Sequence, residues 1–343
     1  MGFRSILMKK VIYSLLTTIL MVGCNQKTKL PAIAPDAITE STLHDTDDPA
    51  IWVNKNDPGS SIVFGTDKDS DGAIYAFDLQ GKIIEEKTIR GLKRPNNVDI
   101  RYDFKLTDST TVDVMVFTER ERQQFRMFSI PDMQPIDGGG FAVFTEATEP
   151  KHKLPMGISL YHSPTDSSLY AIVGRKSGPL DGYLHQYLLS AKEGKVQAKL
   201  VRKFGKFSGS KEIEAIAVDD AQGIVYYSDE GKCIRKYYAD PSKGNEELAC
   251  FGESYFLDDI EGIAVAKEFN GKNYIIVSNQ QNYSFVIFDG SDLSFVKEVN
   301  LSTVETDGCE VTTTPLGDVF PNGLFVAMND ERNFYFYDLG KIL

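Results

Sequence analysis

The stretch IVFGTDKDSDGAIYAFD, residues 62–78, contains two short apolar segments on either side of a charged turn. The apolar segments are rich in Ile, Val, Phe and Tyr, residue types that favour β-strands. The Asp, Ser and Gly residues between them are typical of a turn. We therefore expect a β-hairpin here, and the fold depends on how often the hairpin recurs.

Five further stretches repeat this pattern: VMVFTERERQQFRMFSI (114–130), YAIVGRKSGPLDGYLHQYLL (170–189), VYYSDEGKCIRKYY (225–238), YIIVSNQQNYSFVIFD (274–289) and LFVAMNDERNFYFYD (324–338). The second strands of the six hairpins are expected to start near residues 74, 125, 184, 233, 285 and 333. A period of about fifty residues with several strands per unit is typical of a β-propeller. Two packed sandwiches, the alternative, would not give so even a spacing. The sequence predicts an all-β, six-bladed β-propeller.

A further strand precedes each hairpin, and several of these strands begin with acidic residues. The first strand of a propeller blade lies next to the axis, so its start is expected at one mouth of the central channel. The acidic residues expected there are Asp47, Asp48, Glu214, Asp259, Glu261 and Asp307. The hairpin turns are expected at the same mouth and carry Lys68, Arg120, Arg175, Lys176, Asp229, Glu230, Asn329 and Asp330. One face should therefore combine an acidic cluster with a basic one.

The acidic cluster favours a hard cation. In LHDTDDPAIW (43–52) three aspartates run directly into an apolar strand, where unpaired buried charge would be costly. A solvated loop is the alternative, but Ca²⁺ takes about six to eight oxygen ligands and would need such a cluster. The chain has only 4 histidines and no HExxH pattern, which favours calcium over zinc.

Lysines and arginines beside bound calcium make a site for phosphate groups. The chain has no Cys-dependent phosphatase pattern, no Arg-His-Gly run and no Walker A loop. Metal-activated water is then the simplest nucleophile for a phosphatase. Two other functions stay open at this point. A lactonase-like calcium hydrolase would have few basic residues at the mouth, and a non-catalytic binding propeller would have aromatic mouth turns.

The N-terminus is typical of an exported protein. Lys9 and Lys10 precede an apolar run, residues 11–22, that is shorter than the roughly 20 residues of a spanning helix. Gly23-Cys24 at its end predicts a lipoprotein signal, with a plain signal peptide and an incidental cysteine as the alternative. We expect a signal peptide over residues 1–23, lipid on Cys24, a tether over 24–40 and the propeller over 41–343. The protein would be anchored to a bacterial-type membrane through this lipid alone.

Charge and cysteines limit the possible partners and crosslinks. The chain has a net charge of −12, and without residues 1–23, which carry three basic residues and no acid, the net charge is −15. Such a charge argues against nucleic acid as a partner. Three cysteines remain after Cys24. We expect either one Cys233–Cys250 disulfide with Cys309 free, or three free, buried cysteines.

The motifs HDTDDPAIW, NNVDIRYDF, GISLYHS, DIEG, ETDG and GLFVA resemble those of the β-propeller phytases, over almost the whole chain from about His44 to Asp330. The resemblance implies a six-bladed, calcium-dependent phosphatase acting on myo-inositol hexakisphosphate (phytate) or other inositol phosphates. It implies that calcium-activated water attacks the phosphorus directly, without a phospho-enzyme. We expect a monomer. The sequence departs from the family in three places: Met156 replaces a Tyr before the GISLYHS motif, Lys176 replaces a Glu after Gly174-Arg175, and the acidic run before TDG is shortened to STVETDG (302–308).

The resemblance also implies residue roles. Asp48, with the carbonyls of Pro49 and Val98, would hold a structural calcium. The remaining metal ligands would be Asp47, Glu214, Glu230, Glu261, Asp307, Asn329 and Asp330. Catalytic roles fall to Glu214, Glu261 and Asp259, and phosphate binding to Lys68, Arg120, Arg175 and Lys176.

Overall fold

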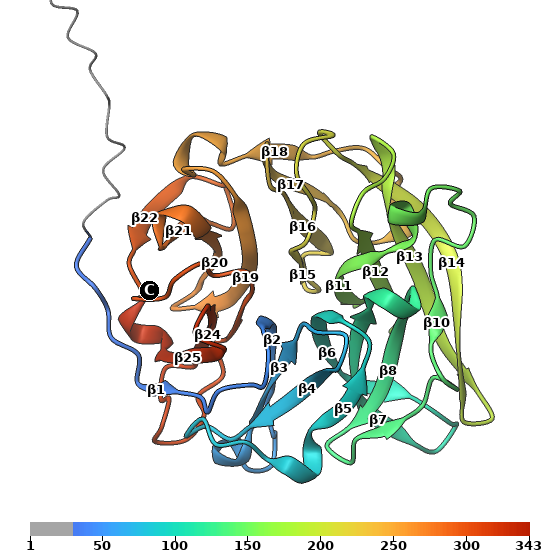
Figure 1. Cartoon of the computed structure of the whole chain (residues 1–343), viewed down its shortest axis with the longest axis horizontal. Coiled ribbons are helices and arrows are strands. Elements are labelled where there is room, and N and C mark those ends of the chain that lie inside the picture. Colours follow the sequence, from blue (N-terminus) through green and yellow to red (C-terminus); the bar gives the residue numbers. More distant parts are fainter. Residues whose placement is uncertain (1–29) are drawn as a thin grey trace, which may run out of the picture.

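The computed structural model describes residues 30–343, which form six antiparallel sheets around a central axis (Figure 1). The prediction of an all-β, six-bladed β-propeller is confirmed. The expected signal peptide and Cys24 lie outside the described residues. Within residues 30–343, no helix is both long and apolar enough to cross a bilayer.

The first three blades run outward from the axis in chain order. Blade one contains β2 (Thr46–Trp52), β3 (Ile62–Asp67), β4 (Gly72–Phe77) and β5 (Ile89–Leu92). Blade two contains β6 (Pro95–Lys105), β7 (Thr111–Glu119), β8 (Gln124–Ile130) and β10 (Phe141–Ala142), with β9 (Gln134–Pro135) also paired to β8. Blade three contains β11 (Pro155–His162), β12 (Leu169–Arg175), β13 (Asp181–Lys192) and β14 (Lys195–Lys206).

The last three blades repeat this arrangement. Blade four contains β15 (Ile216–Asp219), β16 (Ile224–Asp229), β17 (Cys233–Tyr238) and β18 (Ala249–Phe251). Blade five contains β19 (Ile260–Phe269), β20 (Lys272–Asn279), β21 (Ser284–Asp289) and β22 (Phe295–Val299). Blade six contains β23 (Cys309–Thr312), β24 (Leu324–Asn329), β25 (Asn333–Asp338) and β1 (Ala37–Ile38). Each third strand begins within three residues of the start expected from the repeat.

The helices of the described part are short 3-10 turns. They are η1 (Pro58–Ser60), η2 (Glu85–Lys87), η3 (Arg120–Arg122), η4 (Pro150–Lys153), η5 (Pro241–Lys243), η6 (Glu253–Tyr255), η7 (Gln280–Asn282) and η8 (Leu339–Lys341). Two of them, η3 and η7, form the turns between the second and third strands of blades two and five.

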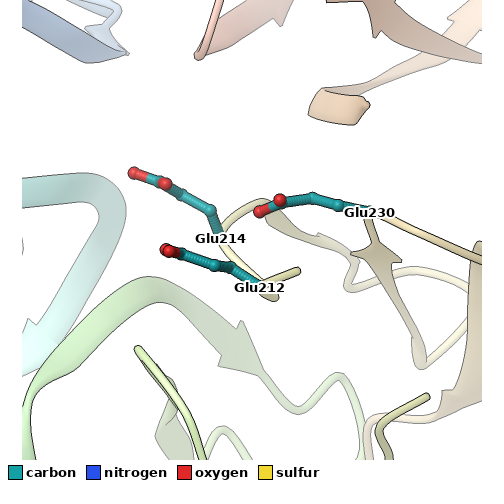
Figure 2. A group of neighbouring side chains, drawn as sticks. All are labelled: Glu212, Glu214 and Glu230. Carbon is teal, nitrogen blue, oxygen red and sulfur yellow. The ribbon is translucent and has the colours of Figure 1, made fainter. Parts of the chain in front are cut away.

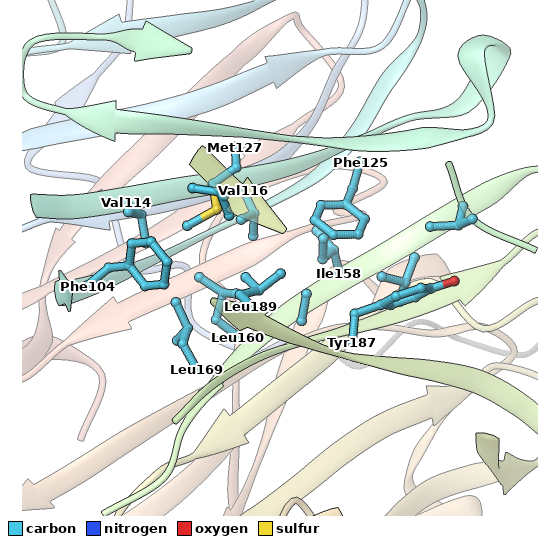
Figure 3. Packing of buried hydrophobic residues seen from close by; sticks show 14 of the residues in the cluster. Phe104, Val114, Val116, Phe125, Met127, Ile158, Leu160, Leu169, Tyr187 and Leu189 are labelled. Atoms are coloured by element: carbon cyan, nitrogen blue, oxygen red, sulfur yellow. The ribbon is translucent and has the colours of Figure 1, made fainter. Parts of the chain in front are cut away.

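Neighbouring blades pack face to face, and their apolar side chains form the core. Figure 3 shows the layer between blades two and three, in which Phe104, Val116 and Phe125 lie against Leu160 and Tyr187. Because the middle strands are covered on both faces, they read as nearly continuous apolar runs rather than as alternating ones. All six residues of β3, for example, are buried.

The N-terminal segment completes the last blade, which corrects one prediction. Residues 24–40 were expected to be a tether, but the described residues 30–40 pack on the propeller. Ala37 and Ile38 pair with Tyr335 and Phe336 of β25 as the outermost strand of blade six. Closer to the N-terminus, the Ile33 N–H donates to the carbonyl of Asn300 at 2.8 Å. Only two residues are needed to cover this sheet edge, so the segment shows no strand periodicity in the sequence.

Blade four contains a disulfide between Cys233 and Cys250, which lie on the paired strands β17 and β18. Cys309 is free and buried. The first of the two expected cysteine arrangements is therefore the one present.

Candidate active site

The starts of the inner strands meet at one mouth of the ring, as the repeat predicts. Asp47 of β2 is buried, and its Oδ1 lies 2.6 Å from Nζ of Lys68, which follows β3. The same Nζ lies 3.1 Å from Oδ2 of Asp307, which precedes β23. Burial disfavours the charge of Lys68, but the carboxylates of Asp47, Glu214 and Asp307 outweigh this effect and raise the pKa of Lys68 above its ordinary value. Lys68 therefore stays a cation between blades one and six.

Asn96, at the start of β6, connects the acidic and basic residues. Its Nδ2 donates to Oδ2 of Asp47 at 2.7 Å and to Oε1 of Glu214, and its Oδ1 accepts from the guanidinium of Arg120. The side chain is fully buried. Sequence reasoning missed Asn96, although it opens the NNVDIRY strand at the position that Asp47 occupies in blade one. That equivalence was the available signal.

Three glutamates form the tightest acidic group in the described part of the chain. Each of Glu212, Glu214 and Glu230 offers an oxygen, and these oxygens lie within 4.8 Å of one another. Figure 2 shows Glu212 and Glu214 projecting side by side from the segment before β15, with the Glu230 carboxylate directed toward them. Glu212 was not predicted. It occupies the start of the same EIEAIAV motif that contains Glu214.

Glu261 of β19 has a buried carboxylate oxygen, Oε2, with no hydrogen-bond partner among the described residues. Its side chain faces the charges of Glu230, Asp307, Glu214 and Asp259. An unpaired buried carboxylate oxygen is costly, and a cation bound at this position would remove the cost.

The neighbouring Asp259 is partnered. Its carboxylate forms an ion pair with Lys211 and accepts from Nε2 of Gln281 at 2.6 Å. Asp259 lies close enough for its charge to act on both Glu230 and Glu261. It therefore lies beside the cluster, with a lysine already paired to it.

Burial and neighbouring carboxylates disfavour the charged form of each carboxyl group in the cluster. Burial, and next the neighbouring Glu212, raises the pKa of Glu230 to about 8. Burial likewise raises the pKa of Asp307 to about 7, although Lys68 opposes the rise. The pKa values of Glu214 and Glu261 lie well above the ordinary range for the same reason, burial beside other carboxylates. An all-oxygen group that resists ionisation until a cation arrives fits Ca²⁺.

Glycines allow the inner strands to approach one another here. A Cβ on Gly157 of β11 would overlap the carbonyl oxygen of Glu214. A Cβ on Gly262 of β19 would lie 2.7 Å from the carbonyl oxygen of Asp307, which accepts the Gly262 N–H at 2.6 Å. These two contacts fix the backbone of carboxylates that come from different blades.

Arg120 lies at the same mouth, at the start of η3. Its guanidinium contacts Asn96 and Sδ of Met156, and its buried Nε has no partner among the described residues. Burial lowers the pKa of Arg120, although Glu214 and Asp47 act in the opposite direction. A buried guanidinium with a free donor beside Lys68 and the carboxylates is placed to receive an anionic group.

The structure differs from prediction for Arg175. Its guanidinium packs 3.9 Å from the ring centre of Phe144, and it donates to the carbonyl of Tyr183 at 3.0 Å and contacts His185 at 2.9 Å. Arg175 is therefore buried between β13 of blade three and Phe144, which follows the last strand of blade two, rather than paired with carboxylates of the mouth. The next residue, Lys176, follows the end of β12 and reaches the acidic group, where it pairs with Glu212.

Asp48 lies deeper in the channel than Asp47. Both aspartates lie in a register irregularity of β2 between Thr46 and Pro49. Oδ2 of Asp48 accepts the Val98 N–H at 3.0 Å, so Asp48 meets Val98 through the amide in this structure. Asp48 lines an axial cavity of about 330 Å³. The three residues predicted for a structural calcium are thus neighbours.

Asn329 and Asp330 are engaged elsewhere. The Asn329 side chain accepts the Val304 N–H at 2.9 Å and donates to Asn333 at 3.0 Å. Asp330 is exposed, and its charge acts on Asp45. The glutamate group in the described residues includes neither side chain: the amide of Asn329 holds the loop before β23, and Asp330 faces solvent.

Comparisons with known proteins bear on the family of this chain. The family model "Phytase" matches residues 5–335. The 3-phytase of Bacillus subtilis (strain 168) is 31% identical over 303 residues, which cover 83% of this chain and 75% of that protein. A solved structure, the β-propeller domain of Cps50 (Swd1) from Myceliophteria thermophila, aligns over 88% of this chain and 85% of its own, with a TM-score of 0.49 and 11% identity. On the extent of the family match and the identity to the Bacillus enzyme, this chain belongs to the phytase family.

Proposed function

We propose that this protein is a calcium-dependent 3-phytase, which removes phosphate from myo-inositol hexakisphosphate and lower inositol phosphates. The observation that carries the proposal is the meeting of Asp47, Glu214, Glu261 and Asp307 with Lys68 at one mouth of the ring. Membership in the phytase family and the 3-phytase relative support it. The charged mouth favours this function over a lactonase-like hydrolase or a binding-only propeller.

Different residues would bind phosphate, hold calcium and accept a proton. Lys68 and Arg120 offer donors for phosphate oxygens. Asp47 holds the Lys68 ammonium, and Asn96 connects Arg120 to Asp47 and Glu214. Asp47, Glu214, Glu230, Glu261 and Asp307 would hold calcium. When bound, calcium polarises phosphoryl oxygens and lowers the pKa of water. The nearby carboxylates Glu214, Glu261 and Asp259 are then the groups available to accept the proton of the attacking water.

Charge makes the cation necessary. Without residues 1–23 the chain carries a net charge of −15, and the substrate is a dense polyanion. Coulomb repulsion between them would oppose binding at this carboxylate-rich mouth. Calcium bound by the carboxylates would make the local charge of the mouth positive, so that phosphate groups could approach Lys68 and Arg120.

The decisive experiment measures phosphate release from myo-inositol hexakisphosphate by the protein without residues 1–24, with calcium and with chelator. We expect release only with calcium. A Glu261→Gln variant, which keeps the size of the side chain, should lose turnover by about 100-fold or more while its melting curve stays cooperative. Calcium-independent release, or full activity in Glu261→Gln, would contradict the assigned site.

We further propose that the protein is exported, anchored by lipid on Cys24, and monomeric. The apolar run followed by Gly23-Cys24 supports the anchor. A Cys24→Ala variant should move from the membrane fraction to the soluble fraction and fail to incorporate labelled fatty acid. Unchanged membrane association would rule out this anchor.

A further inference from the structure

The acidic group contains a cation of its own. Nζ of Lys176 pairs with Oε1 of Glu212, with side chains 38% and 26% exposed. Glu212 shares its group with Glu214 and Glu230, whose carboxylates project beside it in Figure 2. One of the oxygens that the group could offer to a metal is therefore occupied by an ammonium.

Lys176 leaves the group incompletely neutralised. Glu261 is 7% exposed, and its Oε2 has no hydrogen-bond partner in the described part of the chain. The charges of Glu230 and Glu214 act on Glu261, so its orphaned oxygen belongs to the same set of carboxylates. Within residues 30–343, this buried oxygen has no counter-charge or donor of its own, and Lys176 does not supply one.

The backbones on both sides are fixed, whereas the lysine stem is not. Lys176 N–H donates to the carbonyl of Leu154 at 2.8 Å, and the carbonyl of Glu212 accepts the Glu230 N–H at 3.2 Å. The side chain of Lys176 has four flexible bonds and is partly exposed. It can leave Glu212 without any movement of the chain, in contrast to the buried guanidinium of Arg175.

We propose that Lys176 is a displaceable internal cation, which occupies Glu212 in the absence of calcium and moves to a substrate phosphate when calcium takes the carboxylates. The proposal rests on the proposed function. An ammonium and a Ca²⁺ on one carboxylate would repel each other at a few ångströms, so the two compete. By linkage, an anion that draws Lys176 away from Glu212 tightens calcium binding, and calcium tightens anion binding by the same factor.

The first test is a calorimetric calcium titration of the chelator-treated full chain in non-ionic detergent. Lys176→Met keeps the length of the side chain and removes its charge, so calcium affinity should rise by about fivefold, the ratio that corresponds to one partly exposed ion pair. Lys176→Arg should keep the weaker affinity. Lys105→Met, which breaks the exposed pair with Asp108 on a distant hairpin, is the matched control and should match the unmodified protein. Equal affinity in Lys176→Met and the unmodified protein would overturn the proposal.

The second test repeats the titrations with myo-inositol hexakissulfate, an anion that is not a phosphate ester. The anion should tighten calcium binding more in the unmodified protein than in Lys176→Met. If the anion tightened calcium binding equally in both proteins, the coupling between anion and calcium would not depend on Lys176, and the proposal would be wrong. The two proposals fail in different ways. If the unmodified protein released no phosphate with calcium, the proposed function would be wrong. If it released phosphate but Lys176→Met left calcium binding unchanged, only this inference would be wrong.

Discussion

Nζ of Lys68 lies 3.1 Å from Oδ2 of Asp307, although 239 residues separate them in the chain. The contact exists because blade one and blade six are neighbours when the ring closes. The same ammonium lies 2.6 Å from Asp47, so one lysine joins carboxylates of the first and last blades at the mouth of the channel. Its role is both electrostatic and structural.

Replacing Lys68 by Met should weaken both roles. Loss of a charged donor to phosphate should raise KM for the hexakisphosphate by about 10- to 100-fold. In chelator, Asp47 and Asp307 would lose their counter-charge, and the free energy of unfolding should fall by about 3 kcal/mol. Saturating calcium should restore part of this stability. Steady-state kinetics and denaturant unfolding measure the two effects.

The matched control is Lys55→Met, because Lys55 forms a pair with Asp103 at 2.8 Å in which both side chains are more than half exposed. Such a pair is worth little, so KM and stability should stay near those of the unmodified protein. An unchanged KM in Lys68→Met would argue against phosphate binding by this residue.

Asn96 offers a second test of the mouth. Asn96→Ala removes a buried amide that contacts Asp47, Glu214 and Arg120, and should lower stability by about 1–3 kcal/mol and reduce kcat/KM. Asn96→Asp instead adds a carboxylate, so its melting temperature should depend more steeply on calcium. Melting curves across a calcium series distinguish the two variants. If Asn96→Ala behaves like the unmodified protein in both assays, the connecting role of this amide is wrong.

Stability without calcium should fall as the pH rises. The folded-state pKa is raised to about 8 for Glu230 and to about 7 for Asp307, from 4.5 and 3.8, so the native state binds more protons than the unfolded state between these limits. Their contribution is present below about pH 4 and is lost as the pH rises through 8. In chelator, the free energy of unfolding should therefore decrease from pH 5 to pH 8.

Calcium should flatten this pH dependence, because a bound cation replaces the protons. Glu230→Gln should flatten it in chelator, since one raised group no longer titrates. Urea unfolding at four pH values tests both statements. If the free energy of unfolding in chelator increased from pH 5 to pH 8, the raised pKa values of Glu230 and Asp307 would be wrong.

The disulfide should contribute measurably to stability. Cys233 and Cys250 are 17 residues apart, and closing a loop of this length stabilises a protein by about 3 kcal/mol. The Cys233→Ser/Cys250→Ser variant should lose about that amount, and a reducing agent should have no further effect on it. A reducing agent that leaves the unmodified protein unchanged in denaturant would argue against the crosslink.

Much of the fold could be read from local pattern. The hairpin strands have the expected positions because strand propensity and turn chemistry act over a few residues, and the period near fifty residues sets the blade number. The edge strand Ala37–Ile38 could not be found in this way. It is only two residues long, and what fixes it is the open edge of β25 at the other end of the chain.

The candidate site divides along the same line. The sequence by itself determined which inner strands begin with carboxylates and which turns carry Lys68 and Arg120, because the repeat assigns each residue a place in its blade. Only the tertiary structure decided that Asn96 contacts Asp47 and that Glu212 joins the acidic group. It also decided that Arg175 packs on Phe144 while Lys176 reaches Glu212. The physical reason is that these relationships are contacts between blades or choices of side-chain direction, which depend on how neighbouring blades pack and which charge each side chain meets there.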